Sequence, residues 1–159
     1  MRFDVLGLIL GWPLVALTIP LVACAIITGL LDDWELAMRA FTVPAILSLI
    51  IGFLMLRFGT RTNTHTRLRD KEAFAAVALV WPLAVLIGAL PYWFGGVFHG
   101  PFTDGSDVSD ILRGAVNSWF ESMSGFTTTG ATVISTSMSP NCLPGMDCIN
   151  QQPRGLLLW

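Results

Sequence analysis

Residues 119–133 read WFESMSGFTTTGATV, and this stretch decides how the rest of the chain is interpreted. Residues 122–131 contain two glycines and five serines or threonines, a composition that makes a poor membrane-spanning helix. The stretch nevertheless follows three segments that can span a membrane. Irregular backbone at membrane depth is tolerated where protein buries it or where it lines a water-filled path. The pattern therefore predicts a re-entrant pore loop, a short helix followed by an extended filter strand, and ion permeation as the function.

The composition predicts an integral membrane protein. Of the 159 residues, 53% are hydrophobic and 13% are charged, and the mean hydropathy is +0.67, values outside the usual range of soluble domains. We expect the lipid bilayer as the surroundings, no nucleic-acid partner and no cofactor in this chain. Cys24 lies in an apolar run, and Cys142 and Cys148 have no histidine beside them, so the cysteines predict no metal site. A disulfide between Cys142 and Cys148 and two free thiols both stay open.

Three apolar segments predict three transmembrane helices. Residues 5–31 carry no charge, residues 36–56 carry only Arg39 near one end, and residues 73–98 are again uncharged. At about 1.5 Å per residue, each segment is long enough to cross a hydrocarbon core of roughly 30 Å. Arg39 is close enough to the end of its segment for its side chain to reach the interface.

The charge distribution predicts the orientation of these helices. Residues 57–72, RFGTRTNTHTRLRDKE, hold five of the nine Lys and Arg residues, whereas residues 32–39 and 99–110 hold one between them. By the positive-inside rule, residues 57–72 and the N-terminus are cytoplasmic, and residues 99–110 are external. The basic segment is interpreted as a topological determinant, and docking of a cytoplasmic partner or of anionic lipid is the alternative.

A short helix is expected to follow the external segment. Ser106 or Asp107 can cap a helix over residues 109–123, with Asp110 in its first turn. At about 20 Å, this helix is too short to cross the bilayer. It would begin outside and end within the membrane, with the partly negative end of its dipole facing inward. The three aspartates of residues 99–110 can serve as caps and solubilising groups or concentrate cations at an outer mouth.

The threonines and the glycine after this helix have the composition of an ion filter. A selective filter replaces the hydration shell of a cation with rings of oxygens, mostly backbone carbonyls. Glycine adopts the backbone angles that such a strand needs, and β-branched side chains stiffen it. The residues expected to face the ion through main-chain oxygens are Thr128, Thr129 and Gly130. The residues expected to frame them are Thr127, Ala131 and Thr132.

Glu121 is the acidic residue in the part of this segment expected to be buried. An ionisable group at membrane depth is a candidate functional residue. We expect Glu121 to act as a scaffold that accepts hydrogen bonds behind the filter, because uncharged carbonyl sites release ions more readily than a fixed carboxylate. Direct coordination of the ion is the alternative.

Residues 120–133, FESMSGFTTTGATV, resemble the first filter of the Trk/Ktr family of potassium-uptake membrane subunits. Residues 81–93, WPLAVLIGALPYW, resemble the helix that leads to that loop, and the first two spans match the extra N-terminal hairpin of the TrkH branch. The resemblance implies four helix-loop-helix repeats around one pore, each supplying one filter strand. It implies potassium as substrate, bound at Thr128 and Thr129, and Gly130 as the determinant of selectivity over sodium.

The same resemblance implies partners and a location. Proteins of this family form homodimers, rest on a cytoplasmic ring of nucleotide-binding regulatory subunits and lie in the bacterial inner membrane. Under this interpretation, residues 1–72 form a transmembrane hairpin with a basic cytoplasmic loop. Residues 73–159 form an incomplete first helix-pore loop-helix repeat, in which residues 154–159 open the next helix and the chain ends before it is complete.

One filter strand supplies at most one oxygen to each ring, so this chain cannot enclose an ion by itself. We favour an N-terminal portion of a longer transporter over assembly of four copies. The alternative function is a non-conducting truncated membrane protein or an interaction module. An enzyme is not expected, because His65 and His99 fall on opposite sides of the membrane and cannot act together.

Overall fold

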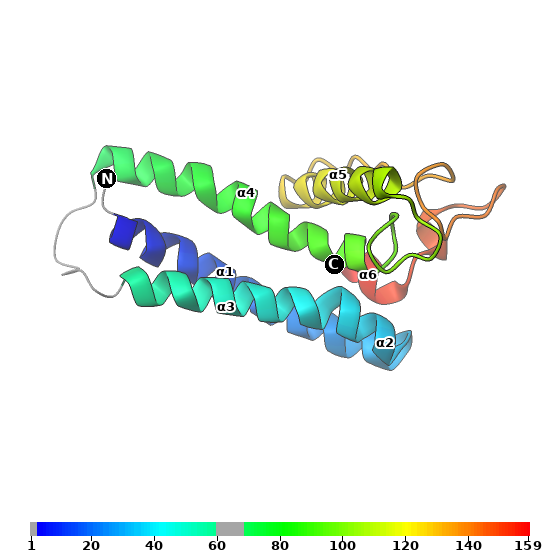
Figure 1. Ribbon diagram of the computed structural model, residues 1–159, viewed down its shortest axis with the longest axis horizontal. Coiled ribbons are helices and arrows are strands. Elements are labelled where there is room, and N and C mark those ends of the chain that lie inside the picture. The colour runs from blue at the N-terminus through cyan, green and yellow to red at the C-terminus, as the bar shows by residue number, and fades with distance from the viewer. Residues whose placement is uncertain (1–2, 60–68) are drawn as a thin grey trace.

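The computed structural model describes residues 3–59 and 69–159, and every regular element within these ranges is helical (Figure 1). The long helices are α1 (Phe3–Leu31), α3 (Val43–Gly59), α4 (Asp70–Phe94) and α5 (Val108–Phe126). The short helices are α2 (Trp34–Ala37), η1 (Met38–Thr42), η2 (Ile149–Gln151) and α6 (Arg154–Leu158). The predicted all-α class is confirmed.

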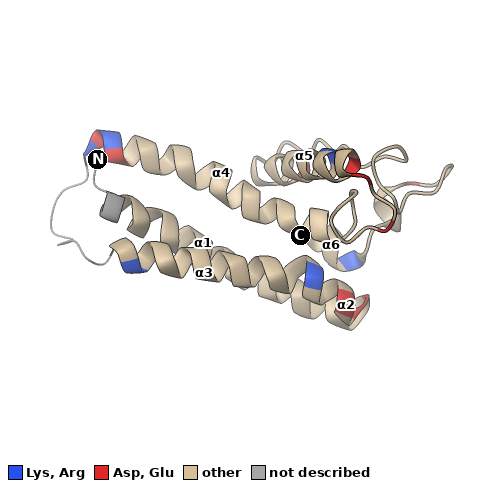
Figure 2. Cartoon of the chain, in the orientation of Figure 1, with Lys and Arg blue, Asp and Glu red and all other residues tan. Residues whose placement is uncertain are grey.

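Three helical stretches are long and apolar enough to cross a membrane, namely Val5–Leu31, Trp34–Gly59 and Asp70–Phe94. In Figure 2, the charged residues of these stretches lie at the two ends of the molecule, and the helices between them are uncharged. An uncharged band between charged ends suits a bilayer, where a charge in the hydrocarbon core is costly. The prediction of three apolar helices that could span a membrane is confirmed.

α1 and α3 form a closely packed hairpin. A Cβ atom on Gly11 would lie 2.9 Å from the Gly52 carbonyl oxygen, and one on Gly52 would lie 3.1 Å from that of Gly11. The two glycines therefore allow the backbones to approach, as small residues do between membrane helices. At the same contact, the buried Ser48 hydroxyl donates a hydrogen bond of 2.7 Å to the Leu14 carbonyl.

The second span is not a regular α-helix at its beginning. Residues 38–42 form the π-helix η1, in which the Val43 N–H reaches back five residues to the Met38 carbonyl. Pro44 follows directly and has no N–H to donate, so the regular ladder cannot run through this point. The altered register places Phe41 in the interior, where it is 0% exposed.

α4 ends at Phe94, and the pair Gly95 and Gly96 follows it within the third apolar segment, residues 73–98. Gly96 adopts a φ of 76°, and the Val97 N–H donates to the Tyr92 carbonyl at 3.1 Å. This six-to-one bond around a left-handed glycine is a Schellman motif, which stops a helix and satisfies its last carbonyls. The glycine pair therefore ends the helix before the apolar run ends.

The basic segment is described only in part. Residues 60–68, with His65 among them, lie outside the described residues, so the prediction for 57–72 cannot be followed through its centre. The end of α3, which contains Arg57, and the start of α4, which contains Asp70 and Lys71, lie at the same end of the molecule as the start of α1 (Figure 1). The side of the membrane that this end faces stays a prediction, as does the division of the chain into residues 1–72 and 73–159.

The connection between α4 and α5 is held by side-chain contacts. His99 Nδ1 and Ser106 Oγ are 3.0 Å apart, and the Trp93 indole N–H donates to the Ile111 carbonyl at 3.2 Å. Asp107 occupies the N-cap position of α5, but its side chain accepts no capping hydrogen bond. Helix α5 continues three residues past the expected end at residue 123, so its 19 residues measure about 28 Å rather than about 20 Å.

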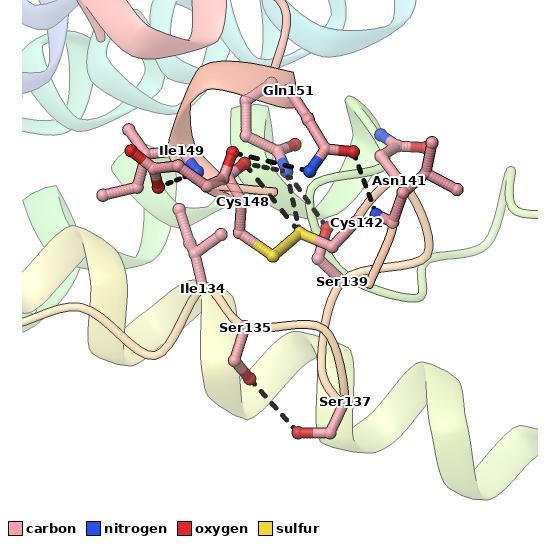
Figure 3. The surroundings of a disulfide bond; sticks show 12 residues. Ile134, Ser135, Ser137, Ser139, Asn141, Cys142, Cys148, Ile149 and Gln151 are labelled. Atoms are coloured by element: carbon pink, nitrogen blue, oxygen red, sulfur yellow. Dashed lines mark hydrogen bonds between the residues drawn. A yellow bond between two sulfur atoms is a disulfide. The ribbon is translucent and has the colours of Figure 1, made fainter. Parts of the chain in front are cut away.

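The segment after residue 135 is closed by a disulfide between Cys142 and Cys148 (Figure 3). The buried Gln152 amide donates to Ser139 Oγ at 3.2 Å and to the Cys148 carbonyl at 3.1 Å. Outside this loop, the Asn141 amide donates to the Gly96 carbonyl at 3.0 Å and ties the segment to the end of α4. Of the two states that the sequence left open, the structure contains the disulfide, which is the state expected of an external segment.

We predict that a membrane-impermeant maleimide added to intact cells labels neither Cys142 nor Cys148 until an impermeant reductant is supplied. Mass spectrometry of the isolated protein measures the labelling of each thiol. The variant Cys148→Ser is the control, because it leaves Cys142 free and should be labelled without reduction. Labelling of unreduced wild-type Cys142 would contradict the disulfide.

Candidate functional site

Helix α5 returns antiparallel to α4 and packs closely against it (Figure 1). The Ser122 hydroxyl donates to the Val85 carbonyl at 2.9 Å, and the rings of Trp81 and Phe126 meet edge to face at 6.5 Å. A Cβ on Gly88 would lie 2.6 Å from the Phe126 ring and 2.7 Å from Ser122 Oγ, so the helices need a glycine here. Because these α4 residues lie in the central part of that helix, the carboxyl end of α5 is level with the middle of a candidate span.

The chain leaves α5 through a turn that contains two left-handed residues. The Thr129 N–H donates to the Ser124 carbonyl at 3.0 Å. Thr128 has a φ of 54° and Gly130 a φ of 71°. Glycine adopts such angles readily, whereas a β-branched residue in this region is a strained outlier. The sequence pointed to unusual backbone angles at Gly130 but not at Thr128.

Two side chains of α5 hold the loop that follows. The half-buried Glu121 carboxylate accepts a hydrogen bond from the Val133 N–H at 3.2 Å. One turn later, the buried Ser124 hydroxyl donates to the Ala131 carbonyl at 2.6 Å. The contact made by Glu121 is of the kind that the scaffold interpretation predicts. Glu121 therefore binds the backbone of the loop, and its scaffold role stays a prediction.

Three successive carbonyls of the loop are left without a partner. Among the described residues, no donor is hydrogen-bonded to the main-chain oxygens of Thr128, Thr129 or Gly130. The oxygens on either side of this run are taken, since the Thr127 carbonyl accepts from the Thr128 hydroxyl at 2.7 Å and the Ala131 carbonyl accepts from Ser124. The unpartnered carbonyls thus include the three that the sequence assigned to the ion. Among the described residues, the carbonyls of Thr132, Val133 and Ile134 accept no hydrogen bond either.

Two of the residues expected to frame the filter, Thr127 and Thr132, have side-chain hydroxyls that make contacts within the loop. The hydroxyls of Thr127 and Thr129 are 2.8 Å apart, and the Thr132 hydroxyl accepts from the Ile134 N–H at 3.1 Å. All residues from 127 to 132 are exposed. Chemically, the loop carries three successive neutral oxygens that no described residue uses, and oxygens of this kind can replace the water around a monovalent cation. Assignment of potassium to Thr128 and Thr129, and of selectivity to Gly130, stays a prediction.

The serines of α5 are the residues that sequence reasoning missed. The sequence assigned no role to Ser122 or Ser124, yet Ser122 binds α4 and Ser124 binds the loop. A helical spacing of two puts them on different sides of α5, which was a usable signal for two separate contacts. Their partners, Val85 and Ala131, cannot be inferred from spacing.

Comparison with curated proteins finds similarity to potassium uptake proteins. The Trk system potassium uptake protein TrkH of Escherichia coli (strain K12) is 32% identical over 96 residues, which are 60% of this chain and 17% of that protein. The protein of the same name from Halomonas elongata is 34% identical over 128 residues, which are 79% of this chain and 23% of that protein. The chain therefore spans about a fifth of the length of these relatives.

No protein-family model matches the chain, and no solved structure matches it. The sequence similarity nevertheless covers most of the chain and agrees with the three apolar helices of the structure. The chain is thus similar, over 60–79% of its own length, to bacterial Trk system potassium uptake proteins.

Proposed function

We propose that this chain supplies the first of four filter strands of a protein that takes up potassium across the bacterial inner membrane. The observation that carries the proposal is the run of unpartnered carbonyls at Thr128, Thr129 and Gly130, which follows the end of α5, where Phe126 meets Trp81 of α4. The similar proteins are named as potassium uptake proteins, which supports the choice of ion. The other three strands come from further repeats of a longer chain.

In this proposal, α5 is a re-entrant pore helix. It begins beside the end of α4 and ends level with the middle of that helix, so its partly negative carboxyl end lies inside the membrane. That end of the dipole favours a cation that has lost its water. Helix α5 is not among the three helices long and apolar enough to span a membrane. Its position and composition thus both favour a helix that enters without crossing.

Glu121 is a scaffold residue in this mechanism and not an ion ligand. Its carboxylate accepts the Val133 N–H at 3.2 Å, three residues beyond Gly130. This contact and the hydrogen bond from Ser124 to the Ala131 carbonyl engage the backbone that follows the left-handed turn. The carbonyls of residues 128–130 are thereby left free for the ion. Neutral oxygens alone then replace the hydration shell, so that bound potassium can leave.

The proposal includes an orientation and partners. The end with Arg57 and the basic segment faces the cytoplasm by the positive-inside rule, and the disulfide-closed segment faces outward. The complete protein forms a homodimer and binds a cytoplasmic nucleotide-binding regulatory subunit. Transport is tested by rubidium uptake into cells that lack other potassium-uptake systems, with the complete protein expressed. Absence of uptake by a correctly inserted protein would overturn the proposed function.

Replacing Gly130 with serine should weaken discrimination against sodium by about tenfold, because a side chain at a φ of 71° costs roughly 1–2 kcal/mol and shifts the carbonyls of residues 128–130. No atom lies within 4 Å of a Cβ built on Gly130, so the variant has room to fold. Inhibition of rubidium uptake by sodium measures the change. Gly145→Ser is the matched control, since Gly145 has a φ of 87° and equally open surroundings away from the loop. Equal selectivity in both variants would remove Gly130 from the filter.

Replacement of Glu121 separates the scaffold role from the ligand role. Glu121→Gln keeps an oxygen that can accept the Val133 N–H and should retain most of the uptake, whereas Glu121→Ala should lower it about tenfold through the lost hydrogen bond. Initial rates of rubidium uptake at matched expression provide the comparison. If the glutamine variant lost as much activity as the alanine variant, the negative charge itself would be required, and Glu121 would be an ion ligand.

A further inference from the structure

The hairpin formed by α1 and α3 is bonded directly to the helix that follows the filter loop. Asp32, at the end of α1, accepts the Arg154 N–H at 3.2 Å on Oδ1 and the Gly155 N–H at 2.9 Å on Oδ2. These are the first two N–H groups of α6, and the N-cap residue Pro153 makes no side-chain capping bond to them. A carboxylate more than 120 residues away in sequence therefore takes the place of a local cap.

Packing fixes α6 against the same hairpin. Gly155 lies so close to Thr28 of α1 that a Cβ atom would overlap the threonine side chain. The Thr28 hydroxyl cannot turn away freely, because it donates to the Cys24 carbonyl at 2.7 Å and its residue is 0% exposed. Directly after α6, the Trp159 ring meets Phe41 of η1 edge to face, with the ring centres 6.3 Å apart. The π-helix that buries Phe41 thus also places it against α6.

Helix α6 is in turn connected to the filter loop. The Trp159 indole N–H donates to the Gly88 carbonyl at 2.8 Å, and Gly88 is the residue of α4 on which Ser122 and Phe126 of α5 pack. Leu156 of α6 and Gly130 of the loop also line one cavity of about 260 Å³. A displacement of α6 would therefore disturb the packing of Gly88 against the end of α5 and change the cavity that Leu156 and Gly130 line.

We infer that Asp32 is a positioning residue for the filter, which acts by clamping α6 to the hairpin. This inference rests on the proposed function and extends it. The hairpin of α1 and α3 contributes no residue to the run of carbonyls at residues 128–130. Under this inference its role is to hold α6 in place. Asp32 touches no ion in this arrangement. Its effect on selectivity passes through α6, Gly88 and the end of α5.

Hydrogen–deuterium exchange in nanodiscs tests the clamp without reference to transport. In Asp32→Ala, the peptide that contains Arg154 and Gly155 should exchange about threefold faster or more, because both N–H groups lose their acceptor. Asp33→Ala is the matched control. It removes the same charge from the next residue, whose carboxylate accepts the Leu36 N–H at 3.2 Å within the hairpin itself. Unchanged exchange in Asp32→Ala, or an equal change in both variants, would overturn the clamp.

Ion selectivity tests the consequence for the filter. Inhibition of rubidium uptake by sodium should be about threefold stronger in Asp32→Ala than in wild type and unchanged in Asp33→Ala, with Asp32→Asn intermediate because it keeps one acceptor oxygen. A fall in uptake without a change in selectivity would show a merely structural role and overturn the positioning role. If the wild-type protein took up no rubidium, both the proposed function and the role of Asp32 in positioning the filter would be wrong. The hydrogen–deuterium exchange result would still show whether Asp32 holds α6 in place.

Discussion

The close approach of α5 to α4 at Gly88 is the contact on which the candidate site depends. It brings Ser122 within hydrogen-bonding distance of the Val85 carbonyl and sets the Phe126 ring against Trp81. The depth at which α5 ends follows from this packing, because an amphipathic helix has no register along an apolar neighbour without such contacts. The left-handed turn begins directly after Phe126, so the position of the run of carbonyls follows from the same glycine.

The backbone of the loop has to be satisfied without a regular element, and α5 supplies the partners. Glu121 takes one N–H of the loop and Ser124 takes one carbonyl, and both residues lie in the last two turns of the helix. This division leaves one part of the backbone bonded to protein and another part free. The proposed pore loop requires such a division, because irregular backbone at membrane depth must bond to protein or face water or an ion.

Much of the fold could be predicted from the sequence because the bilayer imposes simple rules on composition. Uncharged runs marked the three candidate spans, and the residues from Thr127 to Thr132 marked the loop. One bound was wrong, because the short helix expected to end at residue 123 continues to Phe126. The left-handed angle of Gly96 after α4 and the π-helix before Pro44 are backbone details that composition does not specify. The bond made by Glu121 agrees with its predicted scaffold role, although its partner could not be named from sequence.

The sequence by itself determined the class of protein, the candidate spans and the place of the loop, because each depends on residue type and local spacing. Only the tertiary structure decided which groups meet. It paired Cys142 with Cys148, placed Ser124 against Ala131 and joined Asp32 to the backbone of α6 across 122 residues. These contacts depend on how helices pack in three dimensions, and periodicity carries no information on partners so far apart. The composition of the sequence therefore indicates where the loop lies, whereas the hydrogen bonds that hold the loop can be seen only in the folded structure.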